Sequence, residues 1–136
     1  SFDVIISTEL LEHVRDWRLV INNMKAALKR EGYLYITTRS HGFPCHGFPH
    51  DFWRYEADDI RRIFSDFDIM VLTRDHVAPG VFLKARKPTA YAPADLSNIA
   101  IYSTILGERA SNISSVKDMP FAKRLVLKIL HSKSRP

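Results

Sequence analysis

Residues 2–8 read FDVIIST and residues 28–38 read LKREGYLYITT, and these two stretches decide the fold class. Each carries a run of β-branched or aromatic side chains, which is typical of β-strands. Between them apolar residues recur at helical spacing, with Lys25 outside the stripe formed by Leu19, Val20, Met24, Ala27 and Leu28. We place the end of this helix at Glu31-Gly32, because glycine suits the left-handed position after a helix. Strand, helix and strand in succession form a βαβ unit, so we expect two parallel strands.

The sequence after this unit predicts a loop, a second helix and a final pair of strands. Residues 39–55 are dense in His, Gly, Pro and aromatic residues, which marks a loop. An apolar stripe gives residues 56–64 the pattern of a helix. Strands are expected over residues 67–72 and 81–85, joined by a short turn, which favours an antiparallel pair. Residues 1–88 are therefore expected to form one α/β domain.

Residues 89–136 are expected to form a helical extension behind a proline-containing linker. Two helical stretches are predicted, over residues 94–106 and 120–131. The second has apolar residues on one side and Lys123, Arg124 and Lys128 beside them. A basic amphipathic helix of this kind can lie on an anionic membrane or in the groove of a partner. Docking on its own domain is the more frequent arrangement, and we favour it.

Composition narrows the class of protein further. The chain has 136 residues, 46% of them hydrophobic, which suits one globular domain. Cys45 is the only cysteine, which favours a reducing compartment, and we expect a cytoplasmic protein. The net charge of +5 is concentrated after residue 88, and we find no strong signal for nucleic-acid binding.

Three stretches resemble class I S-adenosylmethionine-dependent methyltransferases. Residues 2–14, FDVIISTELLEHV, resemble the fourth strand and following loop of that family, where an FDVI…LEHV run recurs. Residues 28–34, LKREGYL, resemble its LKPGGYL turn, with Arg30-Glu31 in place of Pro-Gly. Residues 50–55, HDFWRY, resemble a loop found in one bacterial branch. The resemblance implies a partial Rossmann-like fold that comprises the last four strands of the family, the final pair being antiparallel.

The resemblance also implies what the sequence lacks. In the family, a glycine-rich turn after the first strand and an acidic residue after the second hold the cofactor. The five glycines of this chain lie at other places: Gly32, Gly42, Gly47, Gly80 and Gly107. We therefore expect a fragment or truncated form that binds S-adenosylmethionine weakly or not at all by itself. Its exposed first strand is expected to pair with a second copy or with a partner chain.

Candidate site residues gather where the first predicted strand ends. Ligands of open α/β sheets bind at the carboxyl ends of the strands, so we expect Ser7, Thr8 and Glu9 to face the cofactor. His13 and His50 are expected nearer the methyl acceptor. The unperturbed pKa of histidine, about 6.5, makes His13 a candidate general base for an acceptor hydroxyl.

The spacing Glu9-x-x-Glu12-His13 also suits a divalent ion such as Mg²⁺ or Mn²⁺, because residues at i, i+3 and i+4 share one face of a helical turn. The arrangement resembles the metal site of small-RNA 3′-end ribose methyltransferases and of some quinone-biosynthesis O-methyltransferases. In the RNA enzymes a later loop histidine completes the site, which His50 or His46 could do here. Alternatively, the Glu and His bind no metal and simply cap the helix and order the loop.

Two functions follow as expectations. The first is S-adenosylmethionine-dependent methyl transfer to an oxygen of a small molecule, sugar or lipid precursor. The histidines and aromatic residues of residues 39–55 would then contact the acceptor, although the aromatic residues could equally pack the loop onto the sheet. The second is a non-catalytic, methyltransferase-like module that acts in binding or assembly.

Overall fold

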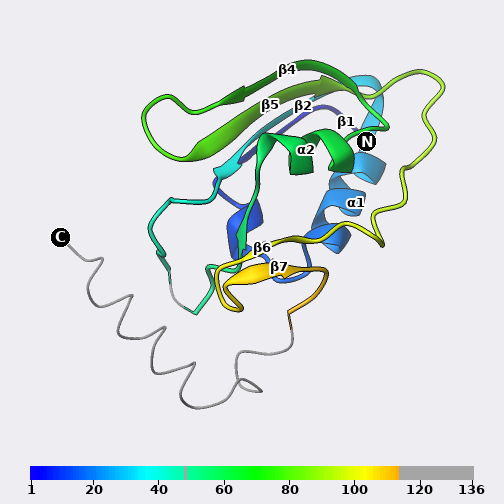
Figure 1. The fold of residues 1–136 in the computed structure, drawn as a ribbon. Coiled ribbons are helices and arrows are strands. Elements are labelled where there is room, and N and C mark those ends of the chain that lie inside the picture. Colours follow the sequence, from blue (N-terminus) through cyan, green and yellow to red (C-terminus); the bar gives the residue numbers. More distant parts are fainter. Residues whose placement is uncertain (48, 114–136) are drawn as a thin grey trace.

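The computed structural model describes residues 1–47 and 49–113. They form a four-stranded sheet with the order β1-β2-β5-β4 and a small three-stranded sheet with the order β3-β6-β7. Figure 1 shows α1 and α2 together below the larger sheet, and the smaller sheet beyond them. In chain order the elements are β1 (Phe2–Thr8), the short 3₁₀ helix η1 (Leu11–His13), α1 (Trp17–Ala27), β2 (Leu28–Arg39), β3 (Trp53–Arg54), α2 (Ala57–Ile63), β4 (Asp68–Arg74), β5 (Gly80–Arg86), β6 (Ile101–Ser103) and β7 (Glu108–Ala110).

The larger sheet confirms the predicted βαβ unit. β1 and β2 are parallel and joined by α1, and their carboxyl ends meet where Thr8 lies opposite Thr37. β5 pairs with β2 and with β4, antiparallel in both cases, so the final strand pair is antiparallel as expected. The fold is therefore a mixed α/β arrangement. Among the described residues, no helix has the length and apolar character that crossing a membrane requires.

The core-facing side of α1 differs from the prediction. Trp17, Ile21 and Lys25 are buried, whereas Leu19 is exposed, so the predicted stripe was wrong at both Leu19 and Lys25. Lys25 tolerates burial because its Nζ donates to the Asp66 carboxylate at 2.7 Å and 2.9 Å and to the Ile63 carbonyl at 2.6 Å. This buried ion pair ties α1 to the segment that follows α2.

The end of α1 also differs. The helix stops at Ala27, and β2 begins at the next residue. Glu31, not Gly32, takes the left-handed conformation, with φ of 64°. Gly32 is required for space: a Cβ there would lie 2.9 Å from the carbonyl oxygens of Asp3 and Lys29. The glycine therefore permits β1 to approach β2, which is a different role from the predicted helix cap.

The helix predicted over residues 94–106 was wrong. The chain there runs without regular structure to β6, whose Tyr102 and Ser103 pair with the short strand β3. Pairing with β3, which is distant in the sequence, stabilises residues 101–103 as a strand. Arg18 of α1 holds this segment by donating to the carbonyls of Leu96 and Ile99 at 2.9 Å and 2.5 Å. The second predicted helix, over residues 120–131, lies outside the described residues.

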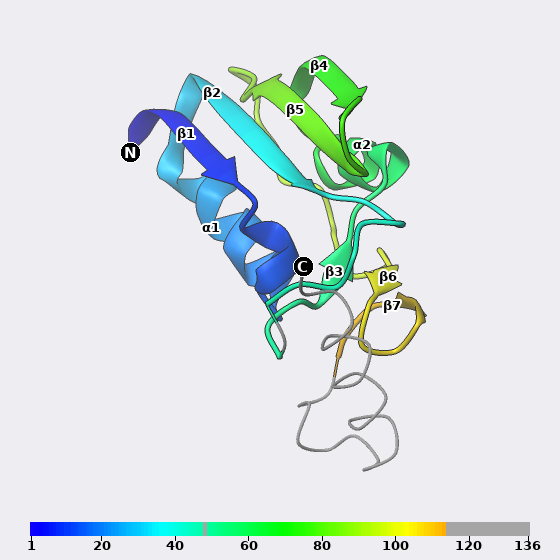
Figure 2. The ribbon, with the colours of Figure 1, turned by 90° about the vertical axis from the view of Figure 1, so that its left-hand side faces the viewer.

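β1 lies at one edge of the larger sheet and presents apolar side chains there. Phe2, Val4 and Ile6 are 60%, 47% and 69% exposed. Figure 2 shows this strand beside α1, with no other strand of the sheet on its outer side. An edge of this kind leaves backbone donors and acceptors available to another strand.

Candidate functional site

The site begins where β1 and β2 end together. After Thr8 the chain turns at Glu9, which has a φ of 49°, an uncommon value for a residue other than glycine. The Glu9 amide donates to the Thr37 carbonyl at 2.9 Å, and the Thr37 hydroxyl donates to the Glu9 carboxylate at 2.7 Å. Arg39 completes the arrangement through an ion pair with Glu9. A left-handed residue held by this many contacts is typical of functional sites.

The two residues before Glu9 differ in their surroundings. Thr8 is exposed at the strand end. Ser7 is buried, and its hydroxyl has no hydrogen-bond partner among the residues that the structure describes. An unpaired buried polar group costs free energy, so such a group often marks a place where a ligand or water binds.

Glu12 lies on η1 with its side chain fully buried. The Thr38 hydroxyl donates to Glu12 Oε2 at 2.7 Å, and Oε1 has no hydrogen-bond partner in the described part of the chain. Burial raises the pKa of Glu12, the hydrogen bond from Thr38 opposes this effect, and the nearby charge of Glu9 adds to it. The loop and the sheet thus enclose a carboxylate that is only half satisfied.

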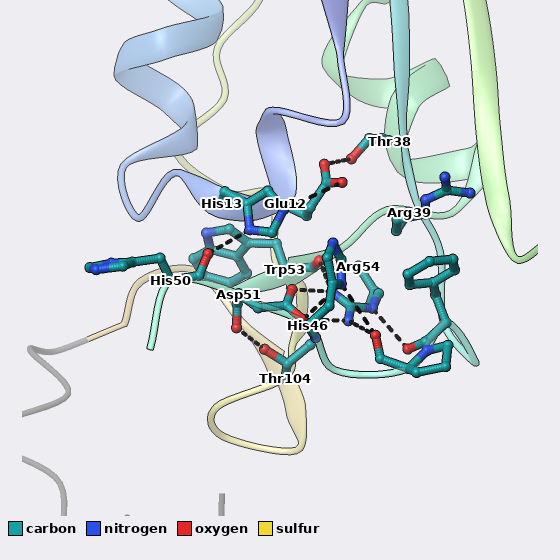
Figure 3. A network of polar contacts seen from close by, with 12 residues as sticks. Glu12, His13, Thr38, Arg39, His46, His50, Asp51, Trp53, Arg54 and Thr104 are labelled. Carbon is teal, nitrogen blue, oxygen red and sulfur yellow. Dashed lines mark hydrogen bonds and ion pairs between the residues drawn. The ribbon is translucent and has the colours of Figure 1, made fainter. Parts of the chain in front are cut away.

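His13 is held by its Nδ1 atom, which lies 2.7 Å from the carbonyl oxygen of His50. Because a carbonyl only accepts, Nδ1 carries the proton and the lone pair is on Nε2. Nε2 lies 4.0 Å from Glu12 Oε1. His50 thus acts on His13 through its backbone, and Figure 3 shows the His50 imidazole directed away from Glu12 and His13.

His46 is the loop histidine that joins Glu12 and His13. Its ring meets the His13 ring edge-on, with the centroids 4.7 Å apart. Glu12, His13 and His46 each offer one ligand atom, and these atoms lie within 4.8 Å of one another. The structure therefore groups two of the residues in the predicted metal set, Glu12 and His13, with His46. It holds Glu9 beside Arg39 and turns the His50 ring elsewhere.

A buried ion pair shapes the loop that carries His46. Arg54 donates to both carboxylate oxygens of Asp51, at 2.5 Å and 2.8 Å, and to the Pro44 carbonyl at 3.1 Å. Asp51 in turn accepts from the His46 amide at 2.7 Å. Burial raises the pKa of Asp51, but the hydrogen bond and charge of Arg54 outweigh it, and the pKa is lowered overall. Asp51 and Arg54 belong to the HDFWRY stretch, but nothing in the sequence distinguished them as an ion pair because they do not lie on a helix.

The same loop borders a hollow of about 230 Å³, lined by His41, Gly42, Phe43, Cys45, Arg54, Tyr102 and Thr104. Tyr102 comes from β6, and its ring meets that of His41 edge-on at 4.6 Å. Burial raises the pKa of the Cys45 thiol to about 11, with Asp51 adding to the effect, so the thiol is a weak nucleophile near neutral pH. Phe52, Trp53 and Tyr55 are buried core residues, so the aromatic part of the loop mainly packs.

Comparison with known proteins defines the class to which this arrangement belongs. Residues 1–76 match the model of a family described as "Methyltransferase domain". That match covers more than half of the chain, and the chain belongs to this family of methyltransferase domains. The resemblance seen in the sequence is thereby confirmed, and the family implies S-adenosylmethionine as the cofactor.

One solved structure can be compared with this chain directly. The crystal structure of TehB from Haemophilus influenzae is similar with a TM-score of 0.50 and 20% sequence identity. The similarity covers 64% of this chain and 36% of that chain, so this chain spans little more than a third of TehB. At 20% sequence identity, this similarity shows a shared fold only. No curated protein matches the chain.

Proposed function

We propose that this chain forms part of an S-adenosylmethionine-dependent methyltransferase that modifies an oxygen of a small molecule, sugar or lipid precursor. One observation carries the proposal: in a methyltransferase domain, Glu12 and His13 follow the strand end at Ser7–Glu9 and cluster with His46 from the loop after β2. A cofactor contact and a proton acceptor would thus lie on consecutive segments. The single cysteine supports a cytoplasmic location.

The residues at the strand end fit the proposed cofactor. S-adenosylmethionine, when bound, supplies an electrophilic methyl group on a sulfonium, and its hydroxyl and ammonium groups are hydrogen-bond donors. The Ser7 hydroxyl is buried without a partner, and the Glu9 carboxylate accepts hydrogen bonds at the edge where ligands of α/β sheets bind. Ser7, Thr8 and Glu9 would hold part of the cofactor.

His13 is the residue best placed to remove the acceptor proton. The His50 carbonyl fixes the tautomer with the proton on Nδ1, which leaves Nε2 free to accept a proton. The imidazolium formed would lie near the buried Glu12 carboxylate, which stabilises the positive charge. His50 contributes by orienting His13. The hollow beside His41 and Tyr102 lies on the same loop and offers room for an acceptor.

A transfer assay with methyl-labelled S-adenosylmethionine and a panel of hydroxylated small molecules tests this function. We expect label in base-stable ethers or base-labile esters, and a rate at least about 100-fold lower in His13→Gln, because general base catalysis contributes that much or more. His76→Gln, at an exposed position in the turn between β4 and β5, serves as the matched control and should retain the rate. Label on acceptor nitrogen, or equal rates in both variants, would contradict the proposal.

The exposed edge of β1 favours a second candidate function, that of an assembly module. Phe2, Val4 and Ile6 are apolar and exposed on a strand whose outer backbone groups have no pairing strand in the described chain. Another strand laid against this edge would satisfy those groups and cover the apolar side chains. The occupant would be a second copy or a partner chain.

Sedimentation at tens of micromolar tests the assembly function. We expect a dimer or larger species for the wild-type chain and a shift towards monomer in Ile6→Lys, because a charge at the edge opposes strand pairing. Val77→Lys is the control: Val77 is 95% exposed, but it lies in the turn between β4 and β5. A monomeric wild type would exclude pairing of β1 with a second copy of the chain, and equal effects of both variants would show that association uses another surface.

A further inference from the structure

The loop after β2 and the chain around the end of β6 meet at the hollow of about 230 Å³ that His41 and Tyr102 line. We propose that this hollow binds an uncharged ring that carries hydroxyl groups, and that such a ring is part of the methyl acceptor. Pockets for drug-sized ligands have volumes of roughly 300–1,000 Å³, so the hollow suits a single ring. The role as acceptor rests on the proposed function, whereas binding of the ring does not.

The hollow offers no unbalanced charge to a ligand. Arg54 is the only arginine, lysine, aspartate or glutamate among the described residues that line it. Asp51 and three backbone carbonyls accept all five N–H groups of the Arg54 guanidinium. The Cys45 thiol is uncharged near neutral pH, because burial raises its pKa to about 11. An anionic ligand would therefore lose its water here without gaining a cationic partner.

Tyr102 and His41 supply the polar atoms of the hollow. Their rings meet edge-on with centroids 4.6 Å apart, so each ring fixes the position of the other. Neither the Tyr102 hydroxyl nor the His41 imidazole has a hydrogen-bond partner among the described residues. A phenol hydroxyl can donate and accept, and a neutral imidazole does one of each. Hydroxyl groups on a ligand ring also donate and accept, so they match both side chains.

The apolar walls of the hollow are held in place. The Phe43 and Tyr102 rings line it, and the face of a sugar or aromatic ring can pack against them. Arg54 holds the loop by donating to the carbonyls of Phe43 and Pro44. The Thr104 hydroxyl donates to the Asp51 carbonyl, which ties the β6 side to the same ion pair (Figure 3). A pre-formed site loses less conformational freedom on binding, which favours a small ligand.

The hollow adjoins both parts of the candidate site through Phe43. The Arg39 guanidinium lies 4.3 Å from the centroid of the Phe43 ring, and Arg39 pairs with Glu9. The Phe43 ring also meets the His46 ring edge-on at 5.1 Å, and the His46 ring meets that of His13. Phe43 thus connects the hollow to the proposed cofactor contact and to the proposed proton acceptor.

Backbone amide spectra of the ¹⁵N-labelled full chain, recorded without S-adenosylmethionine, test the site with matched pairs of probes. The uncharged probes are catechol and the methyl glycosides of glucose, galactose and mannose. Their charged counterparts are 3,4-dihydroxybenzoate and the corresponding methyl uronides. We expect saturable shifts at Gly42, Cys45 and Tyr102 with at least one uncharged probe, and affinity at least about tenfold lower for its charged counterpart. The glycosides and catechol distinguish a sugar from an aromatic ring.

Substitutions that keep the ring and remove the polar atom locate the binding. Tyr102→Phe and His41→Phe should each weaken binding of the uncharged probe by about 2- to 10-fold, the effect of one hydrogen bond between neutral groups. Tyr33→Phe is the matched control, because Tyr33 is also half-buried but lies near the start of β2, away from the hollow. Its affinity should equal that of the wild type. Circular dichroism checks that each variant folds.

Three results would overturn the inference: no saturable shift with any uncharged probe, a charged counterpart that binds as tightly as its partner, or equal affinity in Tyr102→Phe, His41→Phe and the wild type. The transfer assay with labelled S-adenosylmethionine separates this inference from the proposed function. Ring binding in the hollow without transfer to any hydroxyl removes only the proposed function. Transfer to an anionic acceptor, with no shift of these amides by uncharged rings, removes only this inference.

Discussion

Replacing Arg54 with methionine should lower the free energy of unfolding by about 3–5 kcal/mol, the usual cost of breaking a buried ion pair by removing one partner. Arg54 and Asp51 are both buried, and the guanidinium bonds both carboxylate oxygens. Methionine nearly preserves the volume but leaves the Asp51 carboxylate charged and without its partner. The loop that carries His46 would loosen as well, because Arg54 also holds the Pro44 carbonyl.

The chain supplies a matched control for this experiment. Asp58 and Arg61 form an ion pair at the same i, i+3 spacing, but both side chains are exposed. Arg61→Met should therefore change the free energy of unfolding by no more than about 0.5 kcal/mol. Urea unfolding of the two variants, followed by circular dichroism, makes the comparison. Equal effects of the two substitutions would show that burial does not govern the Asp51–Arg54 pair.

A second large effect is expected on cofactor affinity. The chain is expected to bind S-adenosylmethionine weakly by itself, and Glu9→Gln should weaken that binding further, by about 10- to 100-fold, because hydrogen bonds to a charged group contribute roughly 1.5–3 kcal/mol. Asp75→Asn is the control. Asp75 is the other carboxylate that pairs with Arg39 among the described residues, but it follows β4, the strand at the opposite edge of the larger sheet from β1. Equilibrium binding of labelled cofactor measures the affinity of both variants. The same loss of affinity in each would indicate that the cofactor depends on the position of Arg39 and not on a direct contact with Glu9.

Local patterns predicted the βαβ unit and the antiparallel pair, because each strand and helix has a clear period and short connections. They failed where the decisive partner is distant in sequence. Lys25 is buried because Asp66 meets it from the end of α2, and no local pattern shows that contact. Gly32 is needed because Asp3 approaches it, whereas spacing alone made it a helix cap.

The sequence could likewise predict only part of the candidate site. Glu12 and His13 were identified because they adjoin a strand end, and the structure brings them together with a loop histidine. Spacing alone could not determine which histidine of the loop would face them. The path of the loop is fixed by Asp51 and Arg54, which direct His46 inwards and leave His50 to contribute its carbonyl.

We propose that the carboxyl end of β1 contacts S-adenosylmethionine. Backbone amide spectra of the ¹⁵N-labelled chain, recorded during titration with the cofactor to millimolar concentration, test it most directly because they register weak binding residue by residue. We expect saturable shifts concentrated at Ser7, Thr8 and Glu9, while Val81 and Ala85 of β5 stay unchanged. Unchanged amides at the strand end, or shifts confined to other parts of the chain, would contradict it.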